Sequence, residues 1–352
     1  MYRHVIFAVL VMLAPLAAQG NETASDSTWA NRFEYVGIAV DEPGYHVWGS
    51  SPVIGPSGKT HLFVARWPVS SGFAGWMSTC EIARYVADKP EGPFQFSETV
   101  LKGTGIDTWD KQAPHNPTVH KVGNQYVLLY IANTGKKFPA SQRIGMLIAD
   151  KIEGPWKKVG NDGLILSPPD DPGIWSFQSN VGVNNPALLH HPDGRYFLYY
   201  KAMGNGLRRM GVAISDKLEG PYEHYKDYLT SNTRTIEDGY AFVEDGKIYL
   251  LTTDNEAGAG LLWGSDDGIL FEKPILGFDR MTRYFPKPTL AKATNYRGQK
   301  FERPQLLVQD GRPTHLYLAS GTNVTQGDGS CSYVFRIRQR TTADEPDASD
   351  SE

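Results

Sequence analysis

The 352 residues are 40% hydrophobic and 21% charged, as in a folded globular protein with a sizeable core. The formal net charge is −4, so no basic excess would draw the chain to nucleic acid, and a nucleic-acid partner is not expected. Two cysteines cannot build a disulfide framework, and no spacing of His, Cys, Asp and Glu specifies a catalytic metal. We therefore expect neither a cofactor nor a metal.

Residues 1–20 begin with the basic Arg3 and His4, continue with the apolar run VIFAVLVMLAPLAA and end in small residues, which predicts a cleaved secretory signal peptide. The run has 14 residues, too few to span a bilayer. We expect a secreted or periplasmic protein without a membrane span, in which residues 21–32 form an N-terminal linker.

One motif recurs along the rest of the chain: a strand, a polar turn, and an aromatic residue that starts another strand. It appears as EIARYVADKPEGPF from Glu81, RIGMLIADKIEGPW from Arg143 and RMGVAISDKLEGPY from Arg209. A weaker fourth copy, GAGLLWGSDDGILF, starts at Gly258. The recurrence indicates repeated units of about sixty residues.

A second motif, a polar triplet that leads into a strand and a hairpin, opens each unit as GSSPVI, HNPTVH, NNPALL, EDGYAF or ERPQLL. Corresponding residues lie 65, 69, 53 and 65 positions apart, namely Ser51, Asn116, Asn185, Asp238 and Arg303. The first four units each supply four strands, and four antiparallel strands repeated radially form a β-propeller blade. We predict an all-β fold, a five-bladed β-propeller over residues 33–340.

The fifth unit lacks a fourth strand, because the chain becomes acidic after SYVFRIRQR. The segment FEYVGIAV from Phe33 has the pattern of that strand, so we predict that the N-terminal strand closes the last blade and removes an open edge. Residues 341–352 carry five acids and no base, which predicts a disordered tail. Cys80 and Cys331 occupy equivalent positions in neighbouring blades, and either a disulfide or two buried thiols would fit.

The polar triplets open the innermost strand of each blade, so their side chains should converge at one mouth of the central channel. With this pattern, over roughly residues 33–338, the sequence resembles the five-bladed glycoside hydrolases, in particular glycoside hydrolase family 43 and its relatives. The resemblance implies a carbohydrate substrate and the hydrolysis of glycosidic bonds. In family 43 a general-base Asp opens blade one, a tuning Asp opens blade three and a general-acid Glu opens blade four.

Only one of these three family positions keeps its carboxylate in this chain. Glu237 in TIEDGYAF meets the acid position, whereas Ser51 stands at the base position and Asn185 at the tuning position. A serine cannot take a proton from water near neutral pH, and an amide does not titrate. The family's pair of acid and base is therefore not intact.

Other groups at the mouth could complete the chemistry, which requires two carboxyls about 5 to 9.5 Å apart. The expected catalytic residues are Glu237, Asp238, Glu302 and His115. The expected substrate-binding residues are Trp48, Ser51, Arg66, Asp110, Asn116, Asn185 and Arg303. Arg66 and Arg303 would hold a carboxylate or sulfate on an acidic sugar, although Glu302 and Arg303 could also form a structural ion pair and His115 could satisfy backbone groups.

Tryptophans near the loops that lead to or from these strands suit the apolar faces of sugars, although they also fill propeller cores. They are Trp48, Trp67, Trp76, Trp109 and Trp175. The leading hypothesis is an exo-acting glycoside hydrolase with Glu237 as general acid. The alternatives are a carbohydrate-binding propeller without catalysis, suggested by Ser51 and Asn185, and a glycoside phosphorylase, against which export argues because phosphate is scarce outside the cell.

Overall fold

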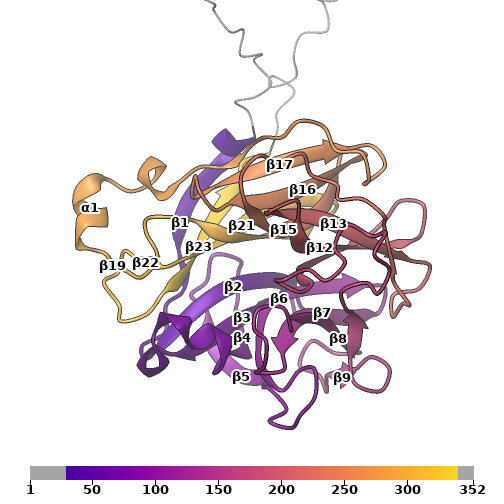
Figure 1. Ribbon diagram of the computed structural model, residues 1–352. Coiled ribbons are helices and arrows are strands. Elements are labelled where there is room, and N and C mark those ends of the chain that lie inside the picture. The colour runs from indigo at the N-terminus through magenta and orange to yellow at the C-terminus, as the bar shows by residue number, and fades with distance from the viewer. Residues whose placement is uncertain (1–28, 340–352) are drawn as a thin grey trace, which may run out of the picture.

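The computed structural model describes residues 29–339. The predicted signal peptide, residues 21–28 of the predicted linker and the acidic tail lie outside the described residues, so these three assignments stay predictions. Between them the chain is almost entirely β structure. Five antiparallel sheets surround a common centre (Figure 1), which confirms the predicted five-bladed β-propeller.

Each of the first four blades is built from strands that follow one another in the sequence. Blade one contains β2 (Tyr45–Ile54), β3 (Thr60–Pro68), β4 (Glu81–Ala87) and β5 (Gln95–Leu101). Blade two contains β6 (Gln112–Val122), β7 (Gln125–Asn133), β8 (Arg143–Ala149), β9 (Lys157–Lys158) and β10 (Leu164–Leu166). Blade three contains β11 (Asn184–His190), β12 (Tyr196–Gly204), β13 (Leu207–Ser215) and β14 (Glu223–His224). Blade four contains β15 (Ile236–Glu244), β16 (Lys247–Asp254), β17 (Ala259–Ser265) and β18 (Ile275–Phe278).

Blade five combines both ends of the described chain: β20 (Glu302–Gln309), β21 (Arg312–Ser320) and β23 (Cys331–Ile337) are joined by β1 (Phe33–Val40). β1 runs antiparallel beside β23, with Phe33 opposite Ile337 (Figure 1). The predicted closure of the ring by the N-terminal strand is thus confirmed. Arg32, in the short helix η1 (Ala30–Arg32), adds a buried ion pair to Glu244 of blade four at 2.9 Å.

The remaining elements are short. They are η2 (Val69–Ser71), η3 (Phe73–Met77), η4 (Met281–Arg283), α1 (Lys287–Lys292) and the small sheet of β19 (Thr294–Asn295) with β22 (Thr322–Asn323). Within residues 29–339, no helix is long and apolar enough to cross a membrane. Cys80 and Cys331 are both buried free thiols, so of the two alternatives left open by the sequence, the structure has no disulfide.

The core lies between neighbouring blades, where strands alternate large apolar side chains toward the adjacent sheet. The largest side chains buried there are aromatic, including Trp67, Trp263, Tyr130, Tyr199 and Tyr200. Such side chains remove much apolar surface from water, which is the main favourable term in folding. The packing holds the five innermost strands, β2, β6, β11, β15 and β20, next to one another around the channel.

Every innermost strand carries a β-bulge at the same place. In β15, Glu237 pairs with Thr253 and Tyr240 with Leu251, so two residues are skipped, and the other four strands repeat this shift. The first skipped residue has positive φ in all five blades: Gly49 (64°), Asn116 (48°), Asn185 (52°), Asp238 (63°) and Arg303 (55°). A bulge redirects side chains that a regular strand would alternate between its two faces.

Candidate active site

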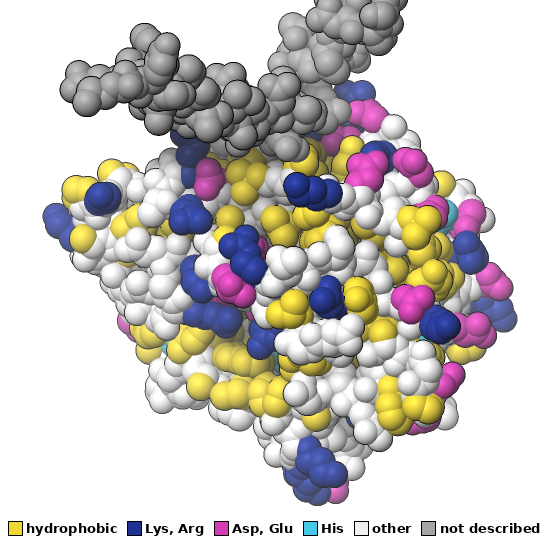
Figure 2. Space-filling view, turned by 45° about the horizontal axis from the view of Figure 1, so that its top comes forward, with side chains coloured by type: hydrophobic (Ala, Val, Ile, Leu, Met, Phe, Trp, Pro, Cys, Tyr) yellow, Lys and Arg dark blue, Asp and Glu magenta, His cyan; other side chains and the backbone are white. Residues whose placement is uncertain are grey.

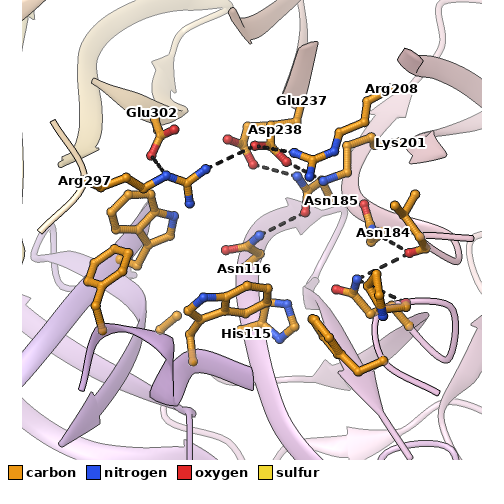
Figure 3. Close-up of a pocket in the computed structure, with 18 of the residues that line it drawn as sticks. His115, Asn116, Asn184, Asn185, Lys201, Arg208, Glu237, Asp238, Arg297 and Glu302 are labelled. Carbon is orange, nitrogen blue, oxygen red and sulfur yellow. Dashed lines mark hydrogen bonds and ion pairs between the residues drawn. The ribbon is translucent and has the colours of Figure 1, made fainter. Parts of the chain in front are cut away.

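A cavity of about 200 Å³ opens where the five innermost strands begin. Six predicted residues line it: His115, Asn116, Asn185, Glu237, Asp238 and Glu302 (Figure 3). The bulges explain how consecutive residues reach one cavity, because His115 with Asn116, and Glu237 with Asp238, would otherwise point to opposite sides of a strand. Trp48 also lines the cavity, as predicted.

The carboxylate of Glu237 is surrounded by cations. Lys201 Nζ donates to its Oε2, and Arg208 Nη1 donates to Oε1 at 3.2 Å. Arg297 Nη2 lies 3.9 Å from Oε1. Burial raises the pKa of Glu237, but Lys201, Arg208 and Arg297 together outweigh burial and lower it to about 2. Glu237 is therefore ionised at neutral pH.

Glu302 lies in the same cavity but has the opposite protonation tendency. Its side chain is buried, and Arg297 Nε approaches Oε2 at 3.4 Å. Burial, with the negative charges of Glu237 and Asp238, raises the pKa of Glu302 to about 7 against the opposing effect of Arg297. Near neutral pH, Glu302 can hold a proton that Glu237 cannot.

A chain of hydrogen bonds crosses the floor of the cavity from blade two to blade four. Asn116 Nδ2 donates to Asn185 Oδ1 at 2.9 Å, and Asn185 Nδ2 donates to Asp238 Oδ1 at 2.6 Å (Figure 3). Burial and the charge of Glu237 raise the pKa of Asp238, while Arg303, 3.8 Å away, opposes that effect. Asparagine adopts positive φ more readily than most residues, which suits Asn116 and Asn185 to both the bulge and the amide bridge.

His115 is a neutral group at the cavity wall. Its Nδ1 lies 2.7 Å from the carbonyl oxygen of Ala113, which can only accept, so Nδ1 carries the hydrogen. Burial lowers the pKa of His115 to about 4. The ring packs against Trp76 with 5.2 Å between centroids. This hydrogen bond to the backbone, together with a hydrogen bond to the side chain of Gln142, fits the structural alternative for His115.

One wall of the cavity is aromatic. Trp48, Trp67 and Trp76 line it together with Phe73 and Phe138. Phe73 packs edge-on against Trp48 and Trp67, with 5.8 Å between centroids in each case. The other two tryptophans pack outside the cavity, Trp109 against Tyr130 and Trp175 against Tyr200. The wall offers flat apolar faces of the kind on which sugar rings stack.

Ser51 is not a cavity residue, and its alignment with Asn116 is wrong by two positions. The pairing of β2 with β3 skips Gly49 and Ser50, so Gly49 is the equivalent of Asp238 and Ser51 continues the regular strand. The dipeptides Ser51-Pro52 and Asn116-Pro117 are similar in sequence but occupy different positions relative to the bulge. Ser51 Oγ is buried and accepts a hydrogen bond from Val119 N at 2.9 Å.

Three other predicted substrate-binding residues also lie outside the cavity lining. Arg303 is fully buried below the floor, where Nη2 donates to the Asn116 carbonyl oxygen at 2.9 Å. Its positive φ turns the side chain across the channel rather than into the cavity. Arg66 pairs with Glu42 and Glu81 on the outer part of blade one, at 2.8 Å in each case.

Asp110 likewise lies outside the cavity, at the periphery of blade two. It pairs with Lys158 and accepts a hydrogen bond from Thr108 Oγ1 at 3.0 Å. The loop that precedes β6 runs outward here, so Asp110 never reaches the channel mouth. Among residues 29–339, no group of three His, Cys, Asp or Glu side chains is arranged to hold a metal ion.

The sequence analysis missed three cations of the cavity: Lys201, Arg208 and Arg297. Lys201 carried a signal, since a lysine inside the apolar strand YFLYYKAMG is seldom buried without a partner. Arg208 stands beside Arg209, which instead donates to the backbone oxygens of Thr230 and Asn232, and the sequence does not distinguish the two arginines. Arg297 lies in a loop without any recurring pattern.

No protein-family model matches the chain. Two curated proteins resemble part of it. An extracellular endo-alpha-(1->5)-L-arabinanase of Thermotoga petrophila is 30% identical over 154 residues, which cover 38% of this chain and 28% of that protein. Extracellular endo-alpha-(1->5)-L-arabinanase 2 of Bacillus subtilis is 29% identical over 168 residues, which cover 44% of this chain and 34% of that protein. The matches thus span about a third of the length of these relatives.

Solved structures resemble nearly the whole chain. Zg3597, a family 117 glycoside hydrolase of the marine bacterium Zobellia galactanivorans, matches with a TM-score of 0.62 at 16% identity, covering 90% of this chain and 92% of that one. A GH43_1 enzyme from Xanthomonas citri, solved with xylose, matches with a TM-score of 0.57 at 12% identity, covering 92% and 95%. At such identities the likeness establishes the fold, and the resemblance in fold expected from the sequence is confirmed.

Proposed function

We propose that the protein is a glycoside hydrolase whose cavity holds the sugar at the cleaved bond. The observation that carries the proposal is a pair of neighbouring carboxyls with opposite pKa shifts, about 2 for Glu237 and about 7 for Glu302. Such a pair supplies one ionised and one protonated carboxyl at the same pH, as cleavage of a glycosidic bond requires. The arabinanase relatives and the aromatic wall support the same reaction class.

The general acid in this proposal is Glu302, not Glu237 as the sequence suggested. Lys201, Arg208 and Arg297 hold Glu237 ionised, so it has no proton to donate. Protonated Glu302 would transfer its proton to the glycosidic oxygen while the bond from that oxygen to the anomeric carbon breaks. Glu237 would act as the ionised partner: it would stabilise positive charge at the anomeric carbon, where the oxygen of a water molecule forms the new bond, and it would accept the proton that this water loses.

The shape of the cavity favours action at a chain end. It is a recess of about 200 Å³ with the aromatic wall on one side and the bulges of blades two to four below it. A terminal sugar fits such a recess, whereas an internal sugar needs an open groove with room on both sides. We further propose that the protein is exported, in keeping with the signal-peptide pattern of residues 1–20 and the extracellular relatives.

Glu302→Gln tests the proposal, because the amide keeps the shape of the side chain and removes the proton. We expect it to lower turnover by about two to four orders of magnitude and to retain sugar binding. Wild type and variant would be assayed on arabino-, xylo- and acidic oligosaccharides, with and without inorganic phosphate. Glu98→Gln, which changes a half-exposed glutamate paired with Arg84 outside the cavity lining, is the matched control.

The outcomes separate the alternatives. Cleavage by wild type without phosphate, lost in Glu302→Gln and kept in Glu98→Gln, supports hydrolysis. Saturable binding by wild type without any cleavage supports a carbohydrate-binding propeller instead. Turnover that appears only with phosphate supports a phosphorylase, and unchanged turnover by Glu302→Gln removes that residue from the mechanism.

A further inference from the structure

We propose that the cavity recognises a sugar that carries an anionic substituent, a carboxylate or a sulfate ester, and that Arg208 and Arg297 bind this group. The inference rests on the proposed function in that it takes the cavity to be a sugar site. The sequence predicted that Arg66 and Arg303 bind the acidic sugar, but both lie outside the cavity lining, and the inference assigns this role to Arg208 and Arg297 instead. Arabinan and xylan chains of neutral pentoses carry no anionic substituent, so they would not need two arginines for recognition.

The first argument is the charge balance. Lys201, Arg208 and Arg297 line the cavity, and Arg303 lies directly below it. Glu237, Asp238 and Glu302 face these four cations. When Glu302 holds the proton that acid catalysis requires, two carboxylates at most oppose four cations. Arg208 and Arg297 are partly exposed, so an anion can reach them and offset the excess of positive charge.

The second argument is that Glu237 does not need both arginines. Lys201 donates to Oε2 and Asn255 Nδ2 donates to Oε1, so each carboxylate oxygen already has a close donor, and Lys201 alone matches the charge. Arg208 adds a hydrogen bond at 3.2 Å, and Arg297 stands 3.9 Å away. Their positive charges therefore exceed what Glu237 requires.

The third argument is that these guanidinium groups remain accessible. The side chain of Arg208 is 34% exposed, and within residues 29–339 its guanidinium forms a hydrogen bond and an ion pair only with Glu237. The side chain of Arg297 is 40% exposed, and in the same part of the chain its guanidinium forms ion pairs only with the carboxylates of Glu237 and Glu302. A guanidinium carries five N–H donors in a planar fork that suits a carboxylate or a sulfate.

The arginines are also placed to meet a group on a stacked sugar. Figure 3 shows Arg208 and Arg297 on opposite sides of Glu237 and Asp238, with their guanidinium groups at the cavity. A ring stacked on the aromatic wall near Trp48 and Trp76 would turn its edge toward this side. On the face drawn in Figure 2, basic, acidic and hydrophobic side chains are interspersed, so that face shows no broad basic surface for a polyanion.

Binding of the anion would also prepare the catalyst. Arg297 lowers the pKa of Glu302, whereas neighbouring negative charges raise it. A substrate anion that pairs with Arg297 weakens the lowering of the Glu302 pKa by that arginine. The negative charge of the same anion raises the pKa further. Glu302 would then keep its proton to higher pH in the complex than in the free protein, so an acidic substrate would extend activity toward alkaline pH.

Calorimetric titration of the full chain tests the recognition without relying on turnover. The probes are galacturonate for a carboxylate, galactose 6-sulfate for a sulfate, and galactose as the neutral sugar. We expect at least one anionic sugar to bind about tenfold more tightly than galactose, the gain from one or two charge-assisted hydrogen bonds. Which anionic probe binds distinguishes a uronic acid from a sulfated sugar.

The variants Arg208→Gln and Arg297→Gln should remove the preference for the anionic sugar, because they weaken its binding much more than the binding of galactose. Arg208→Lys, which keeps the charge, should restore part of it. Arg195→Gln is the matched control, since Arg195 is half-exposed and pairs with Asp193 outside the cavity lining. Thermal unfolding would show that each variant is folded.

Equal or tighter binding of galactose, no binding of either anionic sugar at millimolar concentration, or an equal loss for all three sugars in the arginine variants would each overturn the inference. Cleavage of neutral oligosaccharides without preference for acidic ones would also overturn the inference about the anionic sugar. The proposal that the protein is a glycoside hydrolase would still hold in that case. Selective binding of an anionic sugar by a protein that cleaves nothing would support the inference and overturn the hydrolase.

Discussion

The carboxylates of Glu237 and Glu302 accept hydrogen bonds from the same nitrogen, Nδ2 of Asn255, although their pKa values move in opposite directions. The bond to Glu302 Oε1 is 3.4 Å long and the bond to Glu237 Oε1 is shorter. The two oxygens therefore lie within about 6 Å of each other. One amide thus joins a carboxyl whose pKa is lowered to one whose pKa is raised.

This pair predicts how activity depends on pH. With Glu302 as general acid and a pKa of about 7, kcat/KM should fall above pH 7, by about tenfold for each further pH unit. Arg297 lowers the pKa of Glu302, so Arg297→Gln should move the fall to higher pH. Initial rates of wild type and variant on one cleaved oligosaccharide between pH 4 and 10 would measure it, and an unchanged profile in the variant would contradict the assignment.

Glu302 should also make folding depend on pH. Its pKa rises from 4.5 to about 7 on folding, so its stabilising contribution is complete below pH 4.5 and is lost as the pH rises through 7. Between pH 5 and 8, wild type should therefore lose more stability than Glu302→Gln, by up to about 3 kcal/mol. Urea unfolding at both pH values would measure the difference, and parallel losses would argue against a raised pKa.

The contact between Lys201 and Glu237 predicts an asymmetry between single and double variants. Lys201→Met removes the closest cation from a buried carboxylate and should lower the free energy of unfolding by about 3 to 5 kcal/mol. Lys201→Met combined with Glu237→Leu removes both charges and should recover much of that loss. Chemical denaturation at pH 7 would compare them; an additive result would show that the two residues are not coupled.

Gly49 predicts that blade one cannot accept a side chain at the position equivalent to Asp238. Its φ is +64°, and an added Cβ would lie 3.1 Å from Cγ of Arg303. Gly49→Ala should therefore lower stability by about 1 to 3 kcal/mol. Gly44→Ala, with φ of +83° and nothing within 4 Å of the added atom, isolates the backbone contribution. Equal melting temperatures for the two variants would contradict the contact with Arg303.

Ring closure predicts a further stability effect. Arg32 forms a buried ion pair with Glu244 through two hydrogen bonds and packs over Trp29 at 4.6 Å. Arg32→Met should lower the free energy of unfolding by about 3 to 5 kcal/mol, because Glu244 is left buried without its partner. Chemical denaturation would measure this loss. Arg336→Met, at a half-exposed arginine of β23, is the control and should cost about 1 kcal/mol or less.

The repeated motifs were enough to predict the blades, their order and the closing strand from the sequence. Strand periodicity and turn chemistry are local properties, and the five polar triplets are reinforced by three clear copies of the DKxEGP-type turn and a weaker fourth copy. The same motifs correctly brought Glu237, Asp238 and Glu302 to one end of the channel, because equivalent positions of a radial repeat must converge.

Only the tertiary structure decided which neighbours these carboxyls have. The bulge moved the equivalent position in blade one from Ser51 to Gly49, since strand register depends on hydrogen bonds to a partner strand rather than on the residue before a proline. Lys201 and Arg297 approach Glu237 from a second strand and from a loop, at sequence distances that no motif connects. A pKa depends on burial and on charges a few ångströms away in space, so the opposite pKa shifts of Glu237 and Glu302 could not be read along the chain.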